Sequence, residues 1–287
     1  IKNIFFDKFR VDELIKNFVV QNRNNRSTII SILNYFFFKR LNQNKIRINL
    51  IIDWYENQII DKGFVLGAKK FYNKIKCKGH MGFVTDFETS FRLKPTILEQ
   101  KLGLVPDEIL VCGPKIKETI TKNNRSLKIK LVPAIRNQYL YEIKYKNFKK
   151  INKKKKILVV FSADHDETFK IIRILKDIKD NRLLNNYLIK IRLHRQSPKI
   201  KFNDFKIDND NFINSISKTD IVIATGSTAA IEAYIAGKKV IIIGNNDGLT
   251  KNPLRDKIAK NNYRVCYNSN QLLKEIKYFE KIKFKSS

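Results

Sequence analysis

The feature that most constrains the fold is a repeated alternation of short apolar runs and helical patterns. The runs are rich in β-branched residues, and each ends at a loop that contains small or polar residues. Each loop then leads into a segment whose apolar residues recur at helical spacing. Strands and helices that alternate in this way form parallel α/β units. The sequence therefore predicts an α/β fold with parallel sheets.

The alternation divides the chain into two halves. Strands are expected at 46–52, 74–79, 108–112 and 128–132 in the first half, with a helix over 59–72. About five strands are expected in the second half, at 157–161, 187–193, 221–224, 240–243 and 263–267, with helices over 168–178, 213–217, 229–236 and 271–282. Residues 141–156 are almost purely polar and basic, which is typical of a solvated linker. We therefore predict domains 1–150 and 151–287. Because residue 1 is Ile rather than Met, the possibility that the first domain is truncated at its start stays open.

The formal net charge of +31 indicates either a polyanionic partner or a coding bias. Nucleic acid, an anionic membrane and a phosphorylated substrate are all candidate partners. However, Lys is enriched together with Asn and Ile along the whole chain, and no element concentrates basic and aromatic residues. We therefore expect no specific nucleic-acid partner. The charge would still favour peripheral contact with an anionic membrane face, at about 1 kcal/mol for each nearby Lys or Arg.

Cysteine spacing and apolar run length indicate a cytoplasmic protein. The three cysteines are far apart and form no Cys-x-x-Cys, so a disulfide framework or a zinc site is not expected. Buried free thiols in a reducing compartment explain them. No apolar run reaches the length of a membrane span, and the run from Ile29 to Phe38 is expected to be a buried helix.

The most informative segment runs from Asp220 to Ile243. A buried strand leads directly into Thr225-Gly226-Ser227-Thr228 and then into an Ala-rich helix. Such a helix start presents backbone N–H groups and the positive end of the dipole, so it suits a phosphate. Gly226 would let the ligand approach the backbone, and the two hydroxyls after it would donate to phosphate oxygens. An ordinary N-cap is the structural alternative, and Glu232, one turn later, is placed to reach a ribose hydroxyl.

This segment resembles the donor-binding segment of GT-B glycosyltransferases. The resemblance extends to the loop 162–166 and to the strand end 190–194. In the first half, the Trp-x-Glu-Asn-Gln stretch at 54–58 and residues 106–113 are similar to the bacterial group that builds O-antigens and capsules. The resemblance implies two Rossmann-like domains with parallel sheets facing a central cleft, the first on the acceptor side and the second binding a nucleotide sugar. The residues expected to bind the donor nucleotide are Ser162, Asp164, Arg192, His194, Thr225, Gly226, Ser227, Thr228, Glu232 and Asn245.

Three residues are candidates for the chemistry. Glu56 is the candidate general base, with Asp53 as the alternative, because a carboxylate could deprotonate an acceptor hydroxyl. Capping of the following helix is the structural reading of Glu56. His194 would stabilise charge on the departing nucleotide. Enzymes that use CMP-linked acidic sugars commonly have His-Pro at this strand end, whereas Arg195 follows here, so the donor stays open.

The other side chains near these motifs point to no further chemistry. Trp54 is expected to pack in the core, with stacking on a sugar as the alternative. Asp164, His165 and Asp166 have no metal-ligand spacing, so neither a metal nor another cofactor is expected.

The motifs together predict a glycosyltransferase. It would move a sugar from a nucleotide-activated donor, with a CMP-linked acidic sugar as one candidate, to a surface-polysaccharide or lipopolysaccharide acceptor. A CDP-polyol phosphotransferase of the teichoic-acid type is the enzyme alternative. A basic nucleic-acid-binding protein is the alternative from another class, and the oligomeric state stays open.

Overall fold

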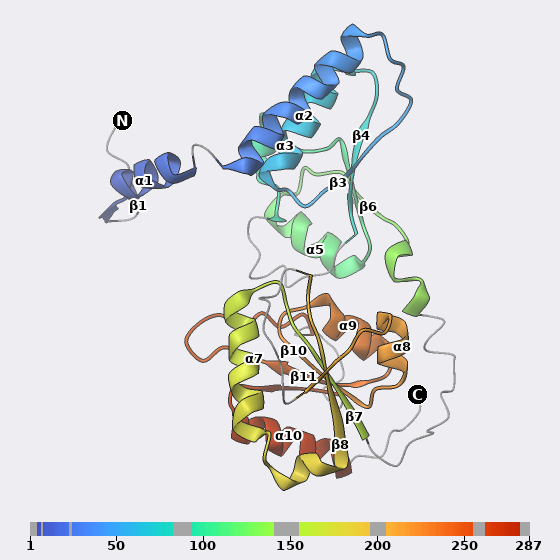
Figure 1. The fold of residues 1–287 in the computed structure, drawn as a ribbon. Helices are drawn as coiled ribbons and strands as arrows, with labels where there is room; N and C mark the ends of the chain where they lie inside the picture. The colour runs from blue at the N-terminus through green and yellow to red at the C-terminus, as the bar shows by residue number, and fades with distance from the viewer. Residues whose placement is uncertain are drawn as a thin grey trace. The chain divides into compact units, whose positions relative to one another are not determined.

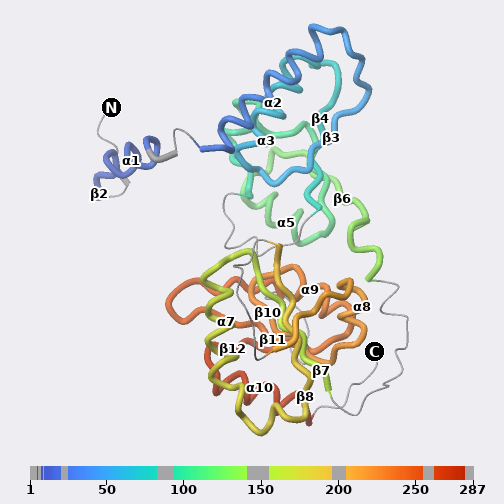
Figure 2. Tube along the Cα trace, viewed as in Figure 1, coloured from blue at the N-terminus to red at the C-terminus, as the bar shows by residue number. Residues whose placement is uncertain are grey.

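A computed structural model describes residues 5–6, 8–22, 25–82, 93–140, 155–195, 205–254 and 262–281. The described residues up to Pro133 belong to one compact unit, and those from Ala134 belong to a second (Figures 1 and 2). Each unit contains its own parallel sheet. Most of the predicted linker, 141–154, lies outside the described residues, so the boundary at 150 stays a prediction.

The first unit is built on four parallel strands in the order β3-β4-β5-β6. These strands are β3 (Ile51–Trp54), β4 (Cys77–Met81), β5 (Glu108–Val111) and β6 (Ile129–Leu131). The helices of the unit are α1 (Asp12–Asn22), α2 (Arg26–Gln43), α3 (Ile59–Phe71), α4 (Ile97–Lys101) and α5 (Pro114–Asn123). A short antiparallel pair, β1 (Phe5–Phe6) and β2 (Phe9–Arg10), precedes α1. Strand β3 begins later than predicted and includes Asp53 and Trp54, which places both side chains at the end of the strand.

Helix α2 only partly confirms the predicted buried helix. One face packs against α3, where Phe38 is buried among Val65, Ala68 and Tyr72. The opposite face exposes Ile29, Ile32, Leu33, Phe36 and Phe37. Of the helices that the structure describes, none combines the length and apolar character that crossing a bilayer requires.

The second unit is built on parallel strands in the order β12-β11-β10-β7-β8-β9. The strands are β7 (Lys155–Val160), β8 (Tyr187–Arg192), β9 (Lys206–Ile207), β10 (Ile221–Ala224), β11 (Lys239–Ile243) and β12 (Tyr263–Cys266). The α-helices are α7 (His165–Ile178), α8 (Phe212–Ser217), α9 (Thr228–Ile235) and α10 (Ser269–Lys281), and η2 (Ile135–Asn137) and η3 (Arg182–Asn186) are 3₁₀ turns. The described sheet thus has one strand more than predicted, because β9 was missed.

Helices cover both faces of the second sheet (Figure 1). On one face, Ile157 and Val159 of β7 pack in a core with α7 and α10. On the other face, Leu158 and Val160 pack in a second core with α8 and α9. All four residues of β10 are buried, as expected for a strand covered on both sides. The unit is therefore a three-layer α/β/α structure.

The strand order places a topological switch point beside β7. From β7 the chain runs outward to β8 and β9, and it then returns to β10 on the other side of β7. In open α/β sheets, ligands bind outside the carboxyl ends of the strands at such a point. The loops after β7 and β10 are therefore the first place to look for a site.

Candidate nucleotide-phosphate site

A pocket of about 260 Å³ lies at the carboxyl ends of β7, β10 and β11. Its position matches the switch point of the sheet. Three of the predicted donor-binding residues line it: Asp164, Thr225 and Asn245. The remaining lining residues are Asp166, Glu167, Lys170, Ile243, Gly244, Leu249, Thr250 and Lys251. The pocket thus combines two cationic side chains with hydroxyl, amide and carboxylate groups.

Thr225 is the most unusual polar residue of the pocket. It is only 2% exposed, and its Oγ1 has no hydrogen-bond partner. Leaving a buried hydroxyl unsatisfied costs about 1–3 kcal/mol. Helix α9 begins at Thr228, so Thr225 lies just before a helix N-terminus. A ligand oxygen in the pocket would satisfy this hydroxyl.

Lys251 connects the loop after β11 to the start of α7. Its Nζ lies 3.2 Å from Oδ2 of Asp164 and 3.5 Å from Oε1 of Glu167. Burial alone would lower the pKa of Lys251, but the charges and hydrogen bonds of the two carboxylates outweigh it and raise the pKa. Lys251 is therefore a fixed positive charge at the pocket wall.

The two carboxylates that hold Lys251 are themselves fixed by the α7 cap. Asp164 is the N-cap of α7, and its Oδ1 accepts from the backbone N–H groups of Asp166 and Glu167. Burial alone would raise the pKa of Asp164, but these N–H groups and Lys251 lower it. Ser162 does not line the pocket, and its hydroxyl instead donates to Oε2 of Glu167 at 2.9 Å. Asp164 and Glu167 thus hold Lys251, and Ser162 supports Glu167, while the donor contacts expected of Asp164 and Ser162 stay predictions.

Lys170 and Asn245 form another part of the pocket wall. The ammonium of Lys170 donates to the carbonyl of Gly244 and lies 3.5 Å from Oδ1 of Asn245. The backbone N–H of Asn245 donates to Oγ1 of Thr250 at 3.0 Å, which closes the loop after β11. Neither Lys170 nor Lys251 was predicted as a site residue. Each contacts a residue that was predicted, Asn245 for Lys170 and Asp164 for Lys251.

Gly226 leaves room for a neighbouring loop, and the ligand approach expected there stays a prediction. A Cβ at this position would lie 2.5 Å from Cβ of Lys251 and 2.9 Å from its carbonyl oxygen. The absent side chain therefore leaves room for the segment that carries Lys251. Ser227 is the N-cap of α9, and its hydroxyl accepts from the N–H of Ala229 at 3.2 Å. This is the ordinary capping role that the sequence offered as the alternative to phosphate binding. Thr228 is the first residue of α9, and neither it nor Ser227 lines the pocket.

Glu232 already has a protein partner at its predicted ribose-binding position. The hydroxyl of Tyr139 donates a hydrogen bond to its carboxylate. Burial raises the pKa of Glu232, whereas Tyr139 and the charge of Arg136 act in the opposite direction. Glu232 does not line the pocket.

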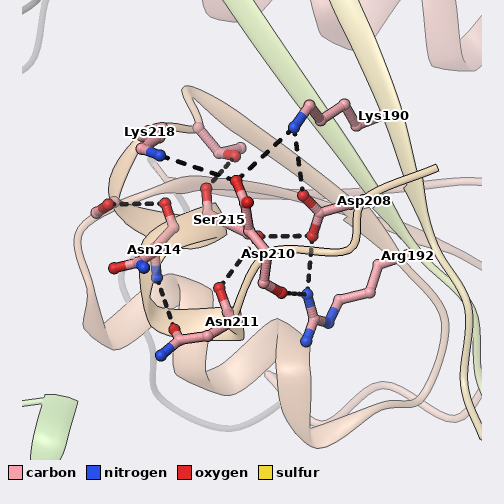
Figure 3. Close-up of polar contacts among 10 residues, drawn as sticks. Lys190, Arg192, Asp208, Asp210, Asn211, Asn214, Ser215 and Lys218 are labelled. Carbon is pink, nitrogen blue, oxygen red and sulfur yellow. Dashed lines mark hydrogen bonds and ion pairs between the residues drawn. The ribbon is translucent and has the colours of Figure 1, made fainter. Parts of the chain in front are cut away.

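Arg192 and His194 lie apart from the pocket. Arg192 turns toward the loop after β9, where its Nη1 contacts Oδ2 of Asp208 at 2.8 Å and the carbonyl oxygen of Asp210 at 2.7 Å (Figure 3). Asp208 also accepts from the hydroxyl of Ser215 at 2.6 Å. His194 is exposed two residues beyond the end of β8. The structure thus ties Arg192 to a neighbouring loop and brings neither residue to the pocket wall.

In the first unit, the carboxylate of Glu56 is hydrogen-bonded by Trp54 and Gln58, which belong to the same Trp-x-Glu-Asn-Gln stretch. Its Oε1 accepts from the indole Nε1 of Trp54 at 3.0 Å, and its Oε2 accepts from the side-chain amide of Gln58. Asp61 accepts from the backbone N–H groups of Glu56 and Gln58. The capping role therefore falls to Gln58 and Asp61, which form the capping box of α3, and the Glu56 carboxylate stays beside Trp54.

Asp53 is a strongly perturbed carboxyl among the described residues of the first unit. Burial, together with the charge of Asp61, raises its pKa to about 7. Its Oδ2 is buried and has no hydrogen-bond partner. An acid with this pKa can take up and release a proton near neutrality, so the geometry is compatible with the predicted base role.

Among the residues that the structure describes, the cysteines and acidic groups add no metal site. Cys77 and Cys266 are buried free thiols as predicted, whereas Cys112 is only half-buried. Within the described ranges, no three His, Cys, Asp or Glu side chains are grouped so that they could hold a metal ion.

Comparisons with known proteins extend the fold assignment. No protein-family model matches the chain, and no curated protein matches its sequence. Solved structures do match its fold. A structure of S. aureus MnaA with UDP has a TM-score of 0.61 at 13% identity, covering 90% of this chain and 74% of that one.

Two other solved structures are also similar to this chain in fold. The UDP-GlcNAc 2-epimerase of Methanocaldococcus jannaschii, in complex with UDP-GlcNAc and UDP, has a TM-score of 0.57 at 12% identity and covers 87% and 73% of the two chains. A UDP-forming α,α-trehalose-phosphate synthase from Burkholderia vietnamiensis has a TM-score of 0.51 at 8% identity and covers 90% and 70%. At these identities the comparison concerns the fold. The chain has the GT-B fold, with two Rossmann-like units whose strands are parallel.

Proposed function

We propose that this chain is a nucleotide-sugar enzyme that binds the donor phosphates in the pocket at the carboxyl ends of β7, β10 and β11. The observation that carries the proposal is the buried, unpartnered hydroxyl of Thr225 in a pocket that also contains Lys170 and Lys251. A phosphate oxygen would accept from the Thr225 hydroxyl, and the ammonium groups of Lys170 and Lys251 would donate to other phosphate oxygens. For Lys251 the phosphate would compete with Asp164 and Glu167, which already hold this side chain. The start of α9 adds the positive end of a helix dipole.

The nucleotide is proposed from the fold neighbours. Two of the neighbouring structures contain UDP, and a third neighbour is described as UDP-forming. We therefore propose UDP-sugars as the first donors to test, and CMP-linked acidic sugars as the second. The hydroxyl and ammonium groups that line the pocket suit phosphate oxygens and do not distinguish the bases.

For the reaction we propose glycosyl transfer to a bacterial surface-carbohydrate acceptor. Glu56 or Asp53 would accept the proton of the acceptor hydroxyl, while the lysines stabilise the charge that develops on the leaving nucleotide. The exposed apolar face of α2 and the net charge of +31 support peripheral contact with an anionic membrane, where lipid-linked acceptors reside.

Binding experiments test the nucleotide site. UDP, CDP, CMP and GDP are titrated into the protein by calorimetry, with uridine as the control that lacks phosphate. We expect one diphosphate to bind and uridine to bind at least tenfold more weakly. Lys251→Met should raise the Kd by about tenfold, equivalent to about 1.4 kcal/mol. Lys218→Met is the matched control, because Lys218 also forms an ion pair but does not line this pocket.

The outcomes separate the competing functions. If none of these nucleotides binds, while RNA binds with a steep salt dependence, the protein is a nucleic-acid-binding protein rather than an enzyme. NMR of the products from a bound UDP-sugar distinguishes free UDP from an epimerised nucleotide sugar. Consumption of CDP-glycerol or CDP-ribitol, but not of any sugar nucleotide, would instead indicate a polyol-phosphate transferase.

A further inference from the structure

Trp54 lies at the surface, although the sequence predicts it in the core. It is the last residue of β3, and it is 46% exposed. A large aromatic side chain contributes most to stability when it is buried, so its exposure requires another explanation. The need of the indole N–H for a partner does not explain it, because Glu56 already accepts that hydrogen bond.

The indole ring is held in one orientation by three neighbours. Its Nε1 donates to Glu56 at 3.0 Å, and its ring meets the imidazole of His80 edge-on, with 5.5 Å between the ring centroids. A Cβ at Gly82 would lie 2.5 Å from Cη2 of the indole, so only glycine leaves room for the ring there. The ring is therefore oriented before any ligand arrives, which lowers the entropic cost of binding.

Polar groups suited to hydroxyls surround the ring. Each carboxylate oxygen of Glu56 accepts one hydrogen bond, from Trp54 or from Gln58, and an ionised carboxylate oxygen has a second lone pair. His80 adds an imidazole whose Nε2 lies 3.6 Å from Sγ of Cys112. Small-molecule sites combine aromatic surface with a few polar groups in this way. A sugar ring is complementary, because it has an apolar C–H face and hydroxyls around its rim.

We infer that Trp54, together with Glu56 and His80, forms a carbohydrate-binding surface in which a neutral sugar ring of the acceptor stacks on the indole. That the bound sugar is the acceptor rests on the proposed function. The binding of a sugar by Trp54 involves residues of the first unit alone. It also gives the Trp-x-Glu-Asn-Gln motif a physical role, in which Glu56 orients the ring and meets the sugar.

The sequence supplies a direct reporter for the test. Trp54 is the single Trp among 287 residues, so the tryptophan emission of the protein comes from this site. Chitotetraose, maltotetraose and a lipopolysaccharide core oligosaccharide are titrated while the emission is recorded, and glycerol at equal concentration is the control. We expect a saturable change with at least one glycan and none with glycerol. If no glycan of the panel changes the emission, the inference is wrong.

Variants then test the residue itself by calorimetry. Trp54→Leu should weaken glycan binding at least tenfold, and Trp54→Phe should retain most of it. Ile52→Ala is the matched control, because Ile52 is 52% exposed and lies two residues earlier on the same side of β3. Equal glycan affinity in Trp54→Leu and the parent protein, with unchanged melting temperatures, would overturn the inference.

Two measurements keep this inference separate from the proposed function. UDP binding is measured in the same samples, because its failure alone removes the nucleotide site and leaves the glycan surface standing. Vesicles of phosphatidylglycerol are also added, since a blue shift of the emission with vesicles but not with glycans would show that Trp54 contacts lipid. That result would refute the carbohydrate inference.

Discussion

Gly226→Ala offers the sharpest test of how the pocket is built. The added Cβ would lie 2.5 Å from Cβ of Lys251 and 2.9 Å from the carbonyl oxygen of Lys251. Carbon atoms in contact are about 3.5–4.0 Å apart, so the segment must move by roughly 1 Å. Overpacking of this kind costs about 1–3 kcal/mol. At about 2–4 °C per kcal/mol for a unit of this size, the melting temperature should fall by about 2–12 °C.

The same displacement should weaken nucleotide binding. Moving Lys251 lengthens its contacts with Asp164 and Glu167, which are now 3.2 and 3.5 Å. Calorimetric unfolding with and without UDP measures both effects in one experiment. The affinity for UDP should fall along with the stability of the second unit.

Gly113→Ala is the control for the chemistry of the substitution. A Cβ at Gly113 meets nothing within 4 Å, and the backbone there is extended, so the change creates no clash. Because Gly113 is the N-cap of α5, where Ala is less favourable than Gly, it should cost only about a few tenths of a kcal/mol. If Gly226→Ala melts at the same temperature as Gly113→Ala, the packing of Lys251 on Gly226 is not what the structure indicates. If it melts lower but binds UDP normally, the position of Lys251 does not matter for the ligand.

Three further predictions concern single side chains. Burial raises the pKa of Asp53 to about 7, so ionisation of this carboxyl disfavours folding as the pH rises from about 4 to 7. Asp53→Asn should therefore gain stability relative to the parent protein across that range. Urea unfolding of both proteins at each pH measures this difference. Asp208→Asn breaks a partly buried ion pair with Arg192, whose side chain is 25% exposed, and urea unfolding should show a loss of about 1–3 kcal/mol, whereas an unchanged midpoint would contradict the pairing. Tyr139→Phe removes a hydrogen bond that lowers the pKa of Glu232, so the carboxyl should titrate at a higher pH by carbon-13 NMR, and a lower or equal value would argue against the contact.

The strands and the switch-point loops could be predicted because their sequences are locally unambiguous. The four residues of β10 are all β-branched or small, and Thr225 follows them directly, so both the strand and the orphan hydroxyl lie where the pattern places them. Strand β9 was missed because it has only two residues, in a polar stretch without periodicity. Its pairing depends on β8, which no local pattern encodes.

The side-chain partners could not be predicted, because they depend on contacts between distant parts of the chain. Lys170 and Lys251 line the pocket, yet 58 Lys and Arg residues occur in the sequence and nothing local distinguishes these two. Arg192 is the last residue of β8, but its guanidinium pairs with Asp208, which lies sixteen residues later in the sequence. Trp54 is exposed at the end of β3, and this strand runs two residues beyond the predicted end at Ile52.

The contact between Tyr139 and Glu232 has a consequence for how the second unit folds during synthesis. Tyr139 and the buried Leu140 belong to the second unit, although they precede the polar stretch from 141 to 156. The ribosome therefore synthesises Tyr139 about ninety residues before Glu232. The contact between the two side chains can form only after α9 has folded. A polypeptide that starts at residue 151 would bury Glu232 without that partner, whereas one that starts at Ala134 would retain Tyr139.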